Sequence, residues 1–262
     1  MKPFFGGNWK MQKLPAEVGS YFSSLQGQLA GAKDKYEAVV FASFPLIPGC
    51  IEKNIGPATV VVGAQNCHWE MSGTFTGEVS PELLKALGVS AVIVGHSERR
   101  KFFSESDEYC EKKVKAVLSR DLTALLCCGE TWDERESGAA KAVVRKQLEV
   151  ALAGVASLSP GEKLVVAYEP VWAISAGPGS KSKPAESADI EEMHQLVHDI
   201  LVELELESTT RVIYGASANP ENVGGIMSIK YVDGVLPGAA SLDAEKFAQI
   251  IIRGSAAFYG KA

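Results

Sequence analysis

The chain has 262 residues, of which 46% are hydrophobic and 22% charged, with a net charge of −6 at pH 7 and a pI near 5.4. This composition supplies a large core, and its acidic balance argues against nucleic acid or a membrane surface as a partner. No apolar run approaches the roughly 18 residues of a membrane-spanning helix. The first residues lead directly into a strand-like segment, so no signal peptide is expected.

Eight short apolar or β-branched segments recur along the chain, and each ends in a polar or glycine-rich turn. They predict strands at residues 4–10, 38–43, 59–65, 91–95, 123–128, 163–168, 211–214 and 231–236. Amphipathic stretches with helical spacing lie between them, for example at 81–87, 106–118, 140–152 and 187–204. Strands that alternate with helices indicate βαβ units and a parallel sheet.

The number of repeats favours a closed barrel. A (β/α)₈ barrel typically has about 250 residues, and no linker-like stretch interrupts the chain, so we expect a single barrel domain over residues 1–262. An open doubly wound sheet is the alternative, but the glycine-rich GxGxxG turn expected after its first strand is missing.

The cysteines predict neither a disulfide framework nor a metal site, because their number is odd and none has zinc-ligand spacing. Reduced thiols in a cytosolic enzyme are expected, and the adjacent Cys127 and Cys128 should fill core space. The five cysteines are Cys50, Cys67, Cys110, Cys127 and Cys128.

Glu169 follows the apolar run 164–168 and precedes Pro170. Proline has no N–H for a strand ladder, so it should end the strand. A lone carboxylate therefore lies at the C-terminal end of a buried strand, where apolar surroundings suit it to abstract a proton near neutral pH. The simpler interpretation is a glutamate that only hydrogen-bonds a loop.

The other strand ends carry further polar groups. Active sites of (β/α)₈ barrels lie at the C-terminal ends of the strands, so these side chains should meet at one rim. One lysine, one histidine, a candidate base and two glycine-bearing turns suit proton transfer on a small phosphorylated carbonyl compound. The set is Asn8, Lys10, Gln65, Asn66, His96, Ser97, Glu98, Glu130, Glu169, 214–217 and 236–239.

In its order and spacing of motifs, the chain resembles the triosephosphate isomerase family over essentially its whole length. The resemblance implies a TIM barrel that interconverts dihydroxyacetone phosphate and D-glyceraldehyde 3-phosphate through an enediolate, in glycolysis and gluconeogenesis. It also implies a cytoplasmic enzyme that needs no metal or organic cofactor. The matching segments are Gly7-Asn8-Trp9-Lys10, Ala64-Gln65-Asn66, 76–80, 94–100, Gly129-Glu130-Thr131, 167–174, Tyr214-Gly215 and Asp233-Gly234.

The resemblance assigns roles to the polar strand-end residues. Glu169 would be the base, and His96 the electrophile, kept neutral at a helix N-terminus; this family is itself the standard worked example of such tuning. Lys10 would supply positive charge paired with Glu98, since a buried ammonium is costly unless paired. Asn8 would hold Lys10 and the substrate.

A second group of residues would hold the phosphate and cover the base. Backbone N–H groups are the expected phosphate donors, as in barrel sites after strands 7 and 8, and two apolar side chains would clamp the carboxylate. The donors would come from Ser175, Ser217, Gly238 and Ala239, and the clamp from Ile174 and Leu236.

Three loops depart from the family pattern. The segment after Ile174 is longer than usual and begins with Ser175 in place of glycine; residues 175–182 should still form a lid. Ala216 and Ala239 replace glycines, and alanine at positive φ costs about 1–2 kcal/mol. Pro237 removes an N–H. The alternatives are therefore a non-catalytic or impaired phosphate-binding protein on the same scaffold, or a different sugar-phosphate isomerase.

The loop at residues 67–77 bears on assembly. In the family this loop inserts into a neighbouring subunit, and Thr76 matches the residue that reaches the partner's active site. Long loops in compact domains usually have a function, so we expect a homodimer through this loop.

Overall fold

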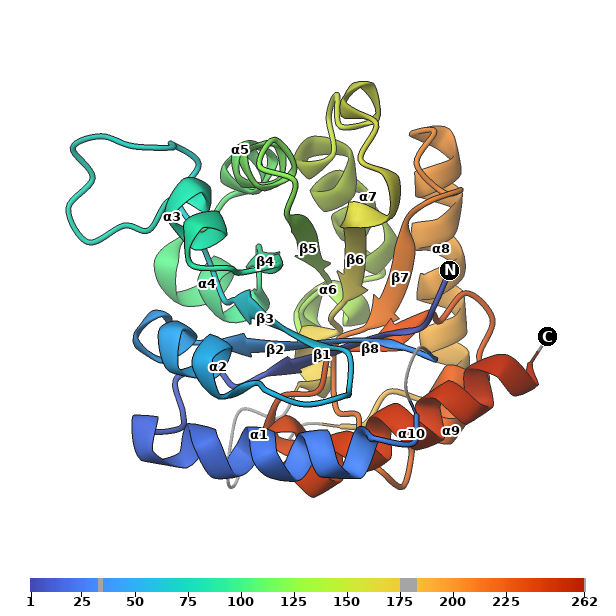
Figure 1. The fold of residues 1–262 in the computed structure, drawn as a ribbon. Helices are drawn as coiled ribbons and strands as arrows, with labels where there is room; N and C mark the ends of the chain where they lie inside the picture. Colours follow the sequence, from blue (N-terminus) through green and yellow to red (C-terminus); the bar gives the residue numbers. More distant parts are fainter. Residues whose placement is uncertain (33–34, 175–182, 262) are drawn as a thin grey trace.

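Eight strands hydrogen-bond in sequence order and close into a barrel, because β8 pairs with β1 (Figure 1). The computed structural model describes residues 1–32, 35–174 and 183–261. Each neighbouring pair of strands is parallel, which confirms the predicted (β/α)₈ TIM barrel. The strands are β1 (Phe4–Asn8), β2 (Glu37–Ala42), β3 (Val60–Ala64), β4 (Ala91–Val94), β5 (Thr123–Cys128), β6 (Leu164–Tyr168), β7 (Arg211–Tyr214) and β8 (Gly234–Val235).

The helices lie outside the ring of strands (Figure 1). The first and last helices, α1 and α10, pack side by side and so join the beginning of the described chain to its end. No helix in the described ranges is long and apolar enough to cross a membrane. The helices are α1 (Pro15–Leu29), α2 (Ile47–Lys53), α3 (Pro81–Ala86), α4 (Ser97–Phe103), α5 (Asp107–Leu118), α6 (Trp132–Glu136), α7 (Ala140–Ala151), α8 (Ser187–Glu203), α9 (Val223–Met227) and α10 (Ala244–Gly260).

Side chains alternate between two hydrophobic cores along each strand. In β5, Leu125 and Cys127 belong to the cluster inside the barrel, whereas Leu126 and Cys128 belong to the layer between strands and helices. Both faces of the sheet are therefore buried, which explains why the strands read as continuous apolar runs. All the cysteines are free and buried, and Cys127 and Cys128 fill core space as predicted.

Two predicted strands extend at least two residues beyond one end of the observed strand. The first ends at Asn8 and not at residue 10, because Lys10 adopts a left-handed φ of 52° that a strand cannot continue. The last is reduced to Gly234–Val235, and Tyr231, its predicted first residue, has a φ of 61°. The rim of the barrel is thus shaped by irregular backbone at these points.

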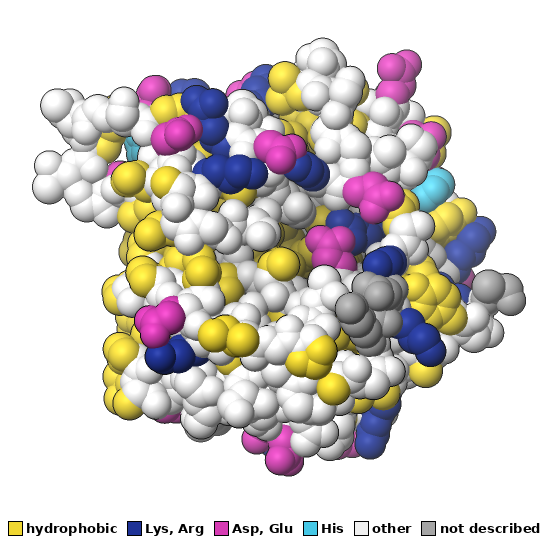
Figure 2. Space-filling model, viewed as in Figure 1, with side chains coloured by type: hydrophobic (Ala, Val, Ile, Leu, Met, Phe, Trp, Pro, Cys, Tyr) yellow, Lys and Arg dark blue, Asp and Glu magenta, His cyan; other side chains and the backbone are white. Residues whose placement is uncertain are grey.

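The surface carries charges of both signs. On the face seen in Figure 2, Lys and Arg side chains are interspersed with Asp and Glu. This face lacks the one-sided positive charge typical of a nucleic-acid-binding surface. Apolar side chains gather at the left of the same view, below the projecting loop that links β3 to α3.

Candidate active site

Glu169 lies directly after β6 and is 1% exposed. Its backbone N–H donates to the carbonyl of Cys128 at 2.7 Å, which anchors it to β5. Its Oε2 accepts a hydrogen bond from the backbone N–H of Ser97 at 3.1 Å. Among the described residues, its Oε1 has no hydrogen-bond partner. A buried carboxylate with one unpartnered oxygen is able to accept a proton from a substrate placed against it.

His96 is the N-cap of α4, and its side chain is held by that helix. Its Nδ1 accepts a hydrogen bond from the backbone N–H of Glu98 at 3.2 Å. An N–H donor requires a lone pair on Nδ1, so this hydrogen bond assigns the ring proton to Nε2. Nε2 lies 3.4 Å from Oε1 of Glu169. The barrel therefore places a proton donor beside a proton acceptor.

Lys10 supplies a cation at the same rim. Its Nζ lies 2.7 Å from Oε1 of Glu98, as expected. Its side chain is 20% exposed, so the paired ammonium is only partly buried. Asn8 Oδ1 accepts from the N–H of Lys10 at 3.0 Å, and Gln65 Nε2 donates to its carbonyl at 2.9 Å. These bonds hold Lys10 in a backbone conformation that costs about 1–2 kcal/mol for a residue other than glycine.

A cavity of about 210 Å³ lies beside these groups. Lys10 is the one cation among its described lining residues. Within the described part of the chain, the backbone N–H groups of Ser217, Gly238 and Ala239 have no hydrogen-bond partner. A small anion next to Lys10 would therefore find backbone donors without competition. The lining also includes Asn8, His96, Ile174 and Leu236.

The two alanine substitutions carry no left-handed strain. Neither Ala216 nor Ala239 has a positive φ, so the expected cost of 1–2 kcal/mol does not arise. Ala239 instead begins a 3₁₀ turn, Ala239–Leu242. The carbonyl of Pro237 accepts a hydrogen bond from the N–H of Asn8 at 3.0 Å, which ties the altered turn to β1.

The described lining of this cavity lacks Glu169, which lines a separate cavity of about 510 Å³, and Glu98, which lines another of about 300 Å³; it also lacks Thr76. Ser175 and the predicted lid, 175–182, lie outside the described residues. Thr76 lies in the loop 67–77, which projects from the barrel (Figure 1), and it is exposed. The predicted role of Thr76, which is to reach the active site of a partner subunit, therefore requires a second copy of the chain.

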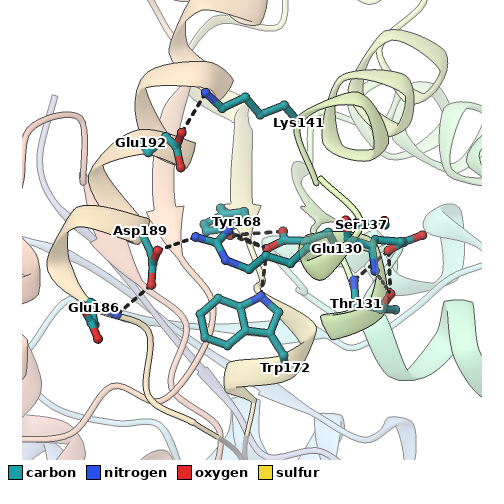
Figure 3. A network of polar contacts seen from close by, with 11 residues as sticks. Glu130, Thr131, Ser137, Lys141, Tyr168, Trp172, Glu186, Asp189 and Glu192 are labelled. Carbon is teal, nitrogen blue, oxygen red and sulfur yellow. Dashed lines mark hydrogen bonds and ion pairs between the residues drawn. The ribbon is translucent and has the colours of Figure 1, made fainter. Parts of the chain in front are cut away.

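Sequence reasoning assigned no role to the network of polar contacts around Glu130 (Figure 3). Glu130 is completely buried and accepts hydrogen bonds from the Tyr168 hydroxyl, from Trp172 Nε1 at 2.9 Å and from Arg135 Nη1 at 3.2 Å. The sequence feature that pointed to Glu130 was its position just after the end of β5, the strand next to β6. Tyr168 and Trp172 flank Glu169 in sequence, so the network holds the chain on both sides of that residue.

Gly215, which the sequence placed at the rim without an individual role, constrains the candidate base. A Cβ atom added there would lie 2.6 Å from Cγ of Glu169 and 3.3 Å from the carbonyl oxygen of Tyr168. Since real Cβ contacts are not that short, only glycine leaves Glu169 its observed place. No group of three or more His, Cys, Asp or Glu side chains in the described ranges is arranged to hold a metal ion.

Comparisons with known proteins identify the family and the fold. The family model described as triosephosphate isomerase matches residues 3–253. The chain is 42% identical over 255 residues to triosephosphate isomerase of Syntrophotalea carbinolica, covering 95% of this chain and 97% of that protein. It is 40% identical over 253 residues to the Finegoldia magna enzyme of the same name, covering 95% of this chain and 98% of that protein. The crystal structure of triosephosphate isomerase from Bartonella henselae superposes with a TM-score of 0.84 at 33% identity, covering 97% of this chain and all of that one.

Proposed function

The chain belongs to the triosephosphate isomerase family of isomerase enzymes, and we propose that it interconverts dihydroxyacetone phosphate and D-glyceraldehyde 3-phosphate. The observation that carries the proposal is the 3.4 Å approach of His96 Nε2 to Glu169 Oε1. Within the described residues, His96 lines a cavity that offers one cation, Lys10, and backbone N–H groups without a hydrogen-bond partner, and Gly215 of the same lining adjoins Glu169. This arrangement fits a small phosphorylated carbonyl compound.

The proposed reaction is a proton transfer between neighbouring carbons. Glu169 takes a proton from the carbon next to the carbonyl, while the Nε2–H of His96 hydrogen-bonds the carbonyl oxygen and stabilises the developing enediolate. Protons are then exchanged between the two oxygens through the imidazole. Glu169 returns its proton to the adjacent carbon, so no atom is gained or lost overall.

Lys10 and the turns after β7 and β8 bind the substrate in this proposal. The Lys10 ammonium neutralises negative charge, and Glu98 holds it at 2.7 Å. Ser217, Gly238 and Ala239 supply backbone N–H donors for phosphate oxygens. Ile174 and Leu236, which line the same cavity, keep water from the reacting groups. Asn8 orients Lys10 through its side-chain oxygen.

We also propose that the enzyme is a cytoplasmic homodimer of single-domain subunits. Another cavity, of about 300 Å³, is also lined by Lys10 and includes Glu98, Met11 and Phe103 in its lining. Met11 is 96% exposed and Phe103 66%. Exposed apolar side chains around a cavity are typical of an interaction site, and the projecting loop 67–77 of a second copy is our proposed occupant.

The test is an assay of purified protein with D-glyceraldehyde 3-phosphate, in which formation of dihydroxyacetone phosphate is coupled to a reductase. Rapid turnover of this substrate, and none of a pentose phosphate, would support the proposal and exclude a different sugar-phosphate isomerase. Folded protein that binds inorganic phosphate but converts neither substrate would favour the alternative of a binding protein without turnover.

A further inference from the structure

Arg135 lies in α6 and joins three parts of the chain that surround the candidate base. Its Nη1 donates to Oε1 of Glu130 at 3.2 Å, and its Nη2 forms an ion pair with Asp189. Its guanidinium carbon lies 5.1 Å from the ring centroid of Trp172. Burial lowers the pKa of Arg135, but Asp189 and other neighbouring groups outweigh this and raise it, so the side chain stays a cation.

The carboxylate of Glu130 receives hydrogen bonds from both sides of Glu169 (Figure 3). Tyr168, the residue before the base, donates its hydroxyl to both oxygens at 3.1 Å. Trp172, three residues after the base, donates Nε1 at 2.9 Å. A fully buried carboxylate is costly without a cation, and Arg135 is the cation that reaches Glu130 among the described residues.

The ion pair with Asp189 extends the network to α8. Asp189 lies in the first turn of that helix, and its Oδ2 accepts from the backbone N–H of Glu186 at 3.2 Å. Figure 3 shows Asp189 on one side of the network and Glu130 on the other. The guanidinium of Arg135 therefore links the first turn of α8 to the carboxylate of Glu130.

We infer that Arg135, with Asp189, is a positioning residue for Glu169: it holds the Glu130 carboxylate, which in turn fixes Tyr168 and Trp172 around the base. This inference rests on the proposed function of Glu169. Arg135 lies outside the described lining both of the cavity that Glu169 lines and of those that Lys10 lines, so it acts through other residues and does not bind the substrate. Its loss should affect the chemical step more than substrate binding.

The experiment compares Arg135→Met with the parent enzyme in steady-state kinetics. A base misplaced by 1 Å can cost about 10²-fold in rate, so we expect kcat to fall at least about tenfold. The cavity around Lys10 is untouched, so KM should change little. Asp189→Asn leaves Glu130 its cation but loosens α8, and should give a smaller loss of kcat. It also keeps the test informative if Arg135→Met does not fold.

A rescue experiment separates positioning from general stability. Arg135→Met combined with Glu130→Gln removes the buried charge together with its cation, while the amide oxygen still accepts from Trp172. This double variant should recover part of the kcat that Arg135→Met loses. If Arg135 only stabilised the fold, the double variant would show no such recovery of kcat per folded molecule.

Arg145→Met is the matched control. Arg145 also reaches α8, through an ion pair with Glu203 at 2.6 Å, but both side chains are exposed and lie away from Glu169. Its loss should leave kcat unchanged. An equal loss of kcat in both single variants, or a parent-like kcat in Arg135→Met, would overturn the inference.

Glu169→Gln, assayed in parallel, distinguishes failure of the positioning role from failure of the proposed function. If Glu169→Gln is inactive while Arg135→Met turns over normally, the positioning role fails and the proposed function stands. If Glu169→Gln itself remains active, the proposed function fails, whatever Arg135 does.

Discussion

The imidazole of His96 lies with Nε2 3.4 Å from Oε1 of Glu169, while its Nδ1 is held by the backbone N–H of Glu98. One edge of the ring is therefore fixed by the helix that His96 caps, and the other edge faces the carboxylate. The distance exceeds that of a good hydrogen bond. The imidazole and the carboxylate do not form a good hydrogen bond with each other, so both are available to a substrate.

Replacement of Glu169 should abolish most activity and leave the fold intact. Glu169→Gln removes the base and should lower kcat by about 10²–10⁴-fold. Glu169→Asp retracts the carboxylate by about 1 Å, which can cost about 10²-fold. Steady-state kinetics and thermal unfolding measure the two effects separately. Near-parental turnover in Glu169→Gln would contradict the assignment of the base.

Loss of the Lys10 cation should weaken binding of the phosphorylated substrate. Lys10→Ala leaves Glu98 without its partner and the phosphate without neutralisation, so we expect a loss of about 3 kcal/mol or more in transition-state binding. Lys13→Ala is the control, because Lys13 also has a positive φ but pairs with Glu17 away from the cavity. Equal affinity of Lys10→Ala and the parent for a phosphate-bearing inhibitor would refute the role.

A single methyl group at Gly215 should displace the base. The added Cβ would lie 2.6 Å from Cγ of Glu169, so Gly215→Ala must move that side chain or the strand end. We expect kcat to fall at least about tenfold, given the sensitivity of proton transfer to position. Gly224→Ala is the control, since its Cβ would meet nothing within 4 Å. Unchanged kcat in Gly215→Ala would show that Glu169 functions from another position.

Shortening the loop 67–77 to a tight turn should convert a dimer into a monomer of reduced activity. Its loss would uncover the apolar side chains beside Lys10 and remove the support that Thr76 of a second copy gives to Asn8 and Lys10. Analytical ultracentrifugation of both forms measures the change. Sedimentation of the intact protein as a monomer at micromolar concentration would count against the dimer.

Stability should fall as the solution becomes acidic, partly because of His194. This side chain is fully buried, and burial lowers its pKa from 6.5 to about 4; a hydrogen bond to Tyr231 opposes the shift and the nearby Lys261 cation adds to it. The unfolded state then binds a proton that the folded state does not, so stability is complete above pH 6.5 and decreases toward pH 4. The effect is on the order of 3 kcal/mol.

Denaturant unfolding at several pH values tests this contribution. His194→Gln should flatten the dependence between pH 6.5 and 4, whatever its effect on stability at neutral pH. His198→Gln controls for replacement of a histidine on the same helix. An unchanged slope in His194→Gln would assign the acid sensitivity to other groups.

The sequence by itself determined the architecture and the strand ends from which the candidate site is built. Alternating strands and helices predict a parallel barrel, and in such a barrel the C-terminal ends of all strands meet at one rim. The position of Asn8, His96 or Glu169 at a strand end was therefore enough to place them together. Periodicity and position along a strand are local properties, which a sequence shows directly.

Only the tertiary structure decided the backbone angles and the partners. Ala216 and Ala239 avoid positive φ, and Lys10 adopts it, because of contacts with distant segments such as Pro237 with Asn8. The bond from Ser97 to Glu169 likewise joins different βα units. Arg135 meets Glu130 and Asp189 only where β5, α6 and α8 converge. Such contacts depend on the three-dimensional course of the chain, and no periodicity in the sequence encodes which side chains will meet.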